Sequence, residues 1–136
     1  MSGFQFVVDE KEANNLILLQ KGDDKLTAKV NEILAKAKGA ERILIAGPAT
    51  VTAEAAEVFA TAGIKLLGNE SQTVGPAEAP MQVHLILLGR GVALLEGVVL
   101  DDIPEGHYFL SAAPLNLAGA DGAPCRAYLI QTEEET

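Results

Sequence analysis

The sequence predicts a single α/β domain, because short apolar runs alternate with segments of helical periodicity along its 136 residues. Arg42 to Ala46 (RILIA) and Ile64 to Leu67 (IKLL) have the length and flanks of strands. Between them, Thr52 opens TAEAAEVFATAG, which has an N-cap residue, early acids and a closing glycine. Strand, helix and strand with short connections form a right-handed βαβ crossover, so these strands should be parallel neighbours.

The remaining elements support a mixed sheet with βαβ units and flanking helices. Residues 26–37 have apolar side chains at helical spacing, and 81–88 are expected to form another helix. Further strands are expected at residues 4–8, 16–19, 92–95, 108–113 and 126–130. Residues 1–130 are predicted to form one domain, and 131–136 an acidic tail. Gly68 to Pro80 is predicted to be a loop at the carboxyl end of a parallel strand, where α/β proteins bind ligands.

Composition excludes several classes of function. The chain has 19 acidic against 10 basic residues, a net charge of −9, and no basic stripe, so nucleic acid and anionic membranes are poor partners. The apolar stretch MQVHLILLGRGVALLEGVVL is interrupted by His84, Arg90 and Glu96, which excludes a transmembrane helix. The first residues do not resemble a secretory signal, so a cytoplasmic location is expected.

Cys125 is the single cysteine and is interpreted as a small buried hydrophobe.

Common catalytic motifs are absent from the sequence, including the P-loop, G-x-G-x-x-G, C-x-x-C, H-E-x-x-H and G-x-S-x-G. With His84 and His107 alone, one chain cannot build a three-histidine metal site. His107 precedes a predicted strand and is interpreted as a surface histidine.

Glu96 is the most unusual residue, because it is the single charge in the apolar run GVALLEGVVL. A buried carboxylate needs a partner or a metal, and His84 lies twelve positions earlier on a neighbouring predicted element. Imidazole and carboxylate are both suitable ligands for zinc or manganese. The alternative is that His84 is a hydrogen-bonded core residue, while Glu96 faces solvent or an arginine such as Arg90 or Arg126.

A second polar cluster follows the strand at 64–67. Glu70, Ser71, Gln72 and Thr73 could contact a substrate or support the ligands, and Glu70 and Ser71 are the main candidates. The alternative is ordinary turn chemistry, with side chains bonded to nearby backbone groups.

The region from Val83 to Ile130 resembles the C-terminal part of the kynurenine formamidase and cyclase family. The family pattern H-x-x-L-L-x-x-G-V-x-x-x-E-x-L is matched at His84, Leu87, Leu88, Gly91, Val92 and Glu96. The A-x-P-L turn is similar to Ala113-Pro114-Leu115, and the G-[AG]-[DT]-G-[AS]-P-x-R-A stretch is similar to 119–127. Upstream, residues 26–74 are similar to the family's helix, strand, helix and G-I-K-L-I-G-x-D-x-x-S segment, with Glu70 or Asn69 standing where the family has Asp.

This resemblance implies the swivelling β/β/α-like cyclase fold and a divalent metal held by His84 and Glu96. The family's N-terminal H-x-G-T-H-x-D-x-P motif has no counterpart here, so two expected ligands remain where catalytic zinc sites have three. Three hypotheses follow. In the first, the chain is a short metal-dependent hydrolase of amide C–N bonds, and a homo-oligomer or a partner chain completes its site. In the second, it is a non-catalytic subunit for oligomerisation or partner binding. In the third, it is a small-ligand binding domain.

Overall fold

The structure is a computed structural model that describes residues 16–19, 30–37, 39–47 and 49–131, without the side chains of 16–19. The predicted strand at 4–8, the first four residues of the predicted helix at 26–37, and the acidic tail after Gln131 lie outside these residues.

Six strands of the described chain form one mixed sheet in the order β4-β3-β2-β1-β5-β6. Strands β1 to β4 are parallel, whereas β5 is antiparallel to both β1 and β6. This confirms the α/β class and the parallel pairing of the two strands that flank the Thr52 helix. The strands are β1 (Leu16–Leu19), β2 (Arg42–Ile45), β3 (Leu66–Asn69), β4 (Ala93–Leu95), β5 (Gly106–Pro114) and β6 (Cys125–Ile130).

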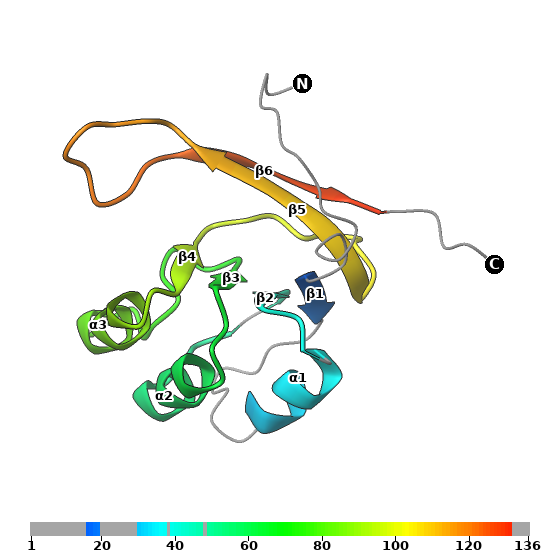
Figure 1. The fold of residues 1–136 in the computed structure, drawn as a ribbon, viewed down its shortest axis with the longest axis horizontal. Helices are drawn as coiled ribbons and strands as arrows, with labels where there is room; N and C mark the ends of the chain where they lie inside the picture. Colours follow the sequence, from blue (N-terminus) through cyan, green and yellow to red (C-terminus); the bar gives the residue numbers. More distant parts are fainter. Residues whose placement is uncertain (1–15, 20–29, 38, 48, 132–136) are drawn as a thin grey trace.

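Three helices connect the parallel strands and cover one face of the sheet (Figure 1). They are α1 (Val30–Ala37), α2 (Ala53–Thr61) and α3 (Met81–Gly89). The predicted cap of α2 is present, because the hydroxyl of Thr52 accepts a hydrogen bond from the backbone N–H of Ala55 at 3.2 Å. Because each crossover has the same hand, successive parallel strands step in one direction and their helices lie side by side on that face.

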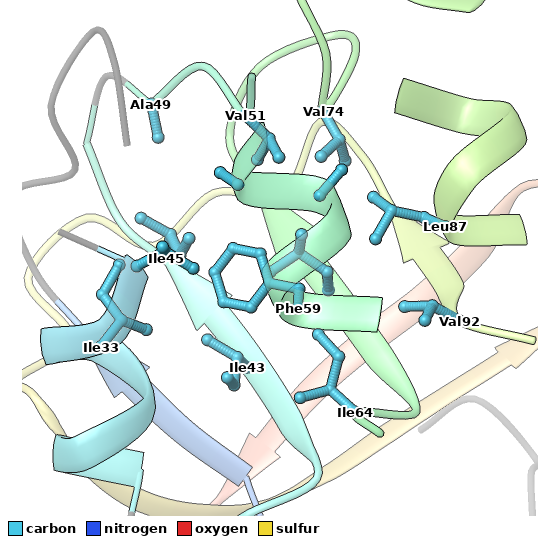
Figure 2. Packing of buried hydrophobic residues seen from close by; sticks show 14 of the residues in the cluster. Ile33, Ile43, Ile45, Ala49, Val51, Phe59, Ile64, Val74, Leu87 and Val92 are labelled. Atoms are coloured by element: carbon cyan, nitrogen blue, oxygen red, sulfur yellow. The ribbon is translucent and has the colours of Figure 1, made fainter. Parts of the chain in front are cut away.

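The sheet has a hydrophobic cluster on each face, as period-two alternation requires. Ile43 and Ile45 of β2 point toward the helices and pack around Phe59 of α2 (Figure 2). Leu44 and Ala46 belong to a second cluster with Leu100 and with side chains of the β5–β6 hairpin. The hairpin therefore contributes to the core of the face opposite the helices.

Two details differ from the sequence predictions. The strand expected at 64–67 begins later, at Leu66, and extends to the polar residue Asn69. Ile64 precedes the strand and is buried. The backbone N–H of the next residue, Lys65, donates to the carbonyl of Glu41 at 2.6 Å. Cys125 was expected to be buried but is exposed, because it is the first residue of β6 beside the hairpin loop. Among the described helices, none reaches the length and apolar character needed to span a membrane.

Gly68 is required where β2, β3 and β4 come close together. A Cβ at this position would collide with Cδ2 of Leu44 and lie 3.1 Å from the carbonyl oxygen of Leu95. We expect Gly68→Ala to reduce the free energy of unfolding by about 1–3 kcal/mol, as other overpacked core sites do. Gly122→Ala is the matched control, since a Cβ at Gly122 meets nothing within 4 Å, and it should change stability by less than about 0.5 kcal/mol. Equal urea midpoints for the two variants would contradict this account.

Candidate metal centre

Two carboxylates lie at the carboxyl edge of the parallel strands. Glu70 follows β3 directly, and Glu96 follows β4 directly. Gly68 of β3 is paired in register with Leu95 of β4, so the chain leaves the two strands at the same level of the sheet. The proximity of the two polar segments therefore follows from the parallel register.

The carboxylate of Glu70 joins the loops that follow β2 and β4. Its Oε2 accepts from the backbone N–H of Gly47 at 2.6 Å, and its Oε1 accepts from the N–H of Leu100 at 2.8 Å. Such charge-assisted bonds to backbone donors are among the stronger hydrogen bonds in proteins. Both oxygens of Glu70 are thus used to hold the backbone around the candidate site.

His84 and Glu96 meet at the same edge. The Nε2 atom of His84, on α3, lies 2.9 Å from Oε1 of Glu96, and the side chains are 25% and 29% exposed respectively. The same Oε1 accepts from the backbone N–H of Val74 at 3.0 Å, which fixes Glu96 against the loop after β3. This confirms that the two residues are neighbours in space, although Glu96 is less buried than its apolar sequence context indicates.

The ring of His84 is oriented by its own helix. Nδ1 lies 2.8 Å from the carbonyl oxygen of Pro80, which can only accept, so Nδ1 carries a proton. Nε2 therefore remains as the nitrogen for a metal, and a backbone carbonyl on the opposite ring nitrogen is a common support for histidine ligands.

Polar side chains are buried where β3 ends and the following loop begins. The side chain of Asn69 is 1% exposed, and its Nδ2 donates to the carbonyl oxygens of Ala49 and Thr73, each at 3.4 Å. Within the described residues, Oδ1 of Asn69 and Oγ1 of Thr73 are buried and have no hydrogen-bond partner. Buried polar atoms without a hydrogen-bond partner are unusual in proteins, so this loop differs from an ordinary apolar core.

The other residues that the sequence suggested lie in different settings. The carbonyl of Ser71 accepts from the N–H of Gly97 at 2.8 Å, which ties the Glu70 loop to the residue after Glu96. Arg90 lies 3.5 Å from Glu57, and Arg126 lies over the ring of Tyr128, so both arginines are engaged away from Glu96. His107 is an exposed residue of β5, which three strands separate from β4.

The backbone partners of the site were not predicted from the sequence. The spacing of four residues between Pro80 and His84 is a signal that could have indicated the carbonyl contact, since such residues are neighbours on a helix. The N–H groups of Gly47, Val74 and Leu100 have no comparable sequence signal, because they are brought in by loops distant in the chain.

A complete metal site is not formed by the described part of the chain. No group of three or more His, Cys, Asp or Glu side chains there is arranged to hold an ion. His84 and Glu96 supply one nitrogen and one oxygen of the kinds that zinc prefers, at a separation suited to two ligands of one ion. The two residues fit half of a divalent-metal site.

Comparison with known proteins identifies relatives by sequence and by fold. No family model matches the sequence. The chain is 42% identical over 80 residues to a kynurenine formamidase of Erythrobacter litoralis, and 38% identical over 80 residues to that of Sphingopyxis alaskensis. Each match covers 58% of this chain.

Solved structures extend the similarity to most of the fold. A potential metal-dependent hydrolase with cyclase activity superposes with a TM-score of 0.71 and 28% identity, covering 94% of this chain and 72% of that one. A predicted metal-dependent hydrolase from Bacillus stearothermophilus gives 0.70 and 27%, covering 95% and 69%. This chain is a relative of the kynurenine formamidases and cyclase-type hydrolases. An isatin hydrolase, at 18% identity and a TM-score of 0.61, shares the fold, with 93% of this chain and 63% of that one covered.

The similarity to the kynurenine formamidases is partial in length. The matched segment spans 37% of the Erythrobacter protein and 38% of the Sphingopyxis protein. The activity of those whole proteins is therefore carried to this chain as a proposal.

Glu70 offers a test of how the site is held together. Glu70→Gln replaces one acceptor oxygen by an NH₂ group that faces a backbone N–H, so we expect a loss of about 1–3 kcal/mol in the free energy of unfolding. Glu78→Gln is the control, because Glu78 is exposed, and it should be close to neutral. Urea unfolding of both variants gives the comparison, and a Glu70→Gln protein as stable as the control would show that the two bonds do not hold the loops.

Proposed function

We propose that this chain provides half of a divalent-metal centre for hydrolysis of amide C–N bonds, with His84 and Glu96 as ligands. One observation carries the proposal: the Nε2 atom of His84 lies 2.9 Å from Oε1 of Glu96, while Nδ1 is held by the carbonyl of Pro80. The fixed Nδ1 leaves Nε2 as the metal-binding nitrogen. The names of the relatives, which include kynurenine formamidases and metal-dependent hydrolases, support metal-dependent hydrolysis of formamides. Imidazole and carboxylate ligands favour zinc or manganese as the metal.

In this proposal each residue has a defined task. Glu96 is positioned by the N–H of Val74, and His84 by the carbonyl of Pro80, so the two donor atoms converge without rearrangement of the backbone. Glu70 keeps the loops after β2 and β4 in place through two backbone N–H groups, and Ser71 lies in the same segment. A divalent cation held by such ligands acts as a Lewis acid that polarises a carbonyl group and lowers the pKa of water.

The remaining ligands have to come from outside the described residues, from a homo-oligomer or from a partner chain. Catalytic zinc sites have three protein ligands and one open position, whereas this centre supplies two. Metal affinity of the isolated chain is therefore expected to be modest, and activity is expected only in the completed assembly.

A non-catalytic subunit is the second candidate, and one observation favours it. The direct contact between His84 and Glu96 satisfies both side chains without a metal, so the fold can use the pair as an ordinary polar contact. Under this alternative, replacing His84 changes the free energy of unfolding, whereas the metal content of the variant equals that of the wild-type protein.

Elemental analysis of protein purified without chelator or His-tag distinguishes the two candidates. Because the affinity of the isolated chain is modest, the metal is measured at equilibrium with excess zinc or manganese. We expect about one bound ion per chain or per dimer under these conditions, lost in both His84→Ala and Glu96→Gln. His107→Ala is the matched control and should keep its metal, because His107 lies on β5 away from the centre. Wild-type protein should also be stabilised on titration with zinc, by about 2.7 kcal/mol at 100 times Kd. Wild-type protein without metal and without a zinc response would contradict the proposal.

A further inference from the structure

Asn69 is an unusual residue for its place in the fold. It is the last residue of β3, it is paired in register with Ile45 of β2, and it is 1% exposed. Asparagine is depleted in strands, and burial of an amide is costly unless the amide is hydrogen-bonded. The side chain therefore has a task that an apolar residue at the end of β3 would not perform.

That task belongs to the NH₂ group of the side chain. Nδ2 of Asn69 donates to the carbonyl oxygens of Ala49 and Thr73, each at 3.4 Å, whereas Oδ1 has no partner among the described residues. Because a carbonyl oxygen can only accept, the two contacts fix which end of the amide faces them. Both bonds are long, so their main effect is to orient the groups that they join and not to add much stability.

The carbonyl of Thr73 belongs to the same peptide group as the N–H of Val74. This peptide is trans and planar, so its C=O and N–H point in opposite directions and turn together. Asn69 holds the oxygen, while the N–H donates to Oε1 of Glu96 at 3.0 Å. The side chain of Val74 is buried in the apolar cluster (Figure 2), and its own carbonyl accepts from Val51 at 3.0 Å. Rotation of the 73–74 peptide plane is thus the motion that the contact with Asn69 restricts.

We propose that Asn69 is a positioning residue for Glu96 and acts through the 73–74 peptide. Held by Asn69, this peptide presents its N–H to Oε1 of Glu96, the atom that also lies 2.9 Å from Nε2 of His84. Once released, the peptide plane can turn, and the carboxylate loses a fixed donor. The consequence for metal binding rests on the proposed function, whereas the link between Asn69 and Glu96 does not.

Nuclear magnetic resonance of the full chain, with chelator present, tests the link. A proton bonded to a carboxylate resonates downfield, so Asn69→Leu and Glu96→Gln should each move the Val74 amide proton upfield. If Asn69 acts through this bond, Asn69→Leu should move the proton less in the Glu96→Gln background than in the wild type. Ile33→Val is the control, because it loosens the same apolar cluster at α1 and should leave the Val74 resonance in place. Additive shifts would overturn the proposal, since a change of packing alone acts equally in both backgrounds.

A second measurement needs no substitution at Asn69 and therefore holds even where Asn69→Leu does not fold. Coupling between two residues is mutual, so Glu96→Gln should move the side-chain amide resonances of Asn69. Glu78→Gln is the matched control, because Glu78 is exposed, and it should leave them unchanged. Asn69 resonances that stay in place in Glu96→Gln would also overturn the link.

Zinc affinity extends the test to the metal centre. Where the wild type binds zinc, Asn69→Leu should weaken binding roughly 10-fold or more, as changes to residues that orient metal ligands do, and Ile33→Val should not. Equal zinc affinities of the two variants would overturn the positioning role. A wild type that binds no zinc would contradict the proposed function, and the comparison of resonances would then decide the role of Asn69 by itself.

Discussion

The close approach of β2, β3 and β4 at Gly68 is the constraint on which the candidate centre depends. Gly68 is packed between Leu44 and Leu95, and the absence of a side chain lets the three strands keep one parallel register. That register places the residues after β3 and β4 at one edge. Glu70 and Glu96 are therefore adjacent because the backbones of their strands are close, and this proximity does not depend on hydrogen bonds made by their side chains.

Backbone hydrogen bonds then convert this adjacency into a defined geometry. Glu70 accepts from the loops after β2 and β4, and Glu96 accepts from the loop after β3. Each carboxylate thus crosses to a loop other than its own, so the three loops are fixed to one another. Networks of this kind are stable when their members are satisfied, and removing one member leaves a backbone N–H without its partner.

The fold was largely predictable from sequence because its main determinants are local. The N-cap at Thr52, the apolar run of β2 and the short connections are sufficient to indicate parallel βαβ units. The start of β3 was predicted two residues too early, because the apolar side chain of Ile64 is typical of a strand. Ile64 instead precedes the strand and is buried in the cluster that joins the sheet to the helices. Cys125 was also misjudged, since its exposure depends on the projecting hairpin and not on its residue type.

The site was predictable only in its side chains. The pairing of His84 with Glu96 follows from an odd charge in an apolar run and from the family resemblance. The backbone donors that position the carboxylates are set by long-range packing, which a single sequence does not encode in any local pattern. The role of Glu70 as a clamp between loops belongs to this class, because any polar loop residue would have given the same signal.

The apolar core predicts that this domain folds without a metal, unlike small domains whose folding free energy comes from the ion. Phe59, Ile43 and Leu67 are completely buried in a cluster that joins the helices to the sheet, and the second cluster seals the opposite face. Metal-dependent domains lack such cores and unfold without their ion. Here the imidazole of His84 contacts the carboxylate of Glu96 directly, which holds the two side chains at the edge of the sheet. The two side chains are thereby kept in position by the apolar core, and in the proposed centre an ion would replace their direct contact.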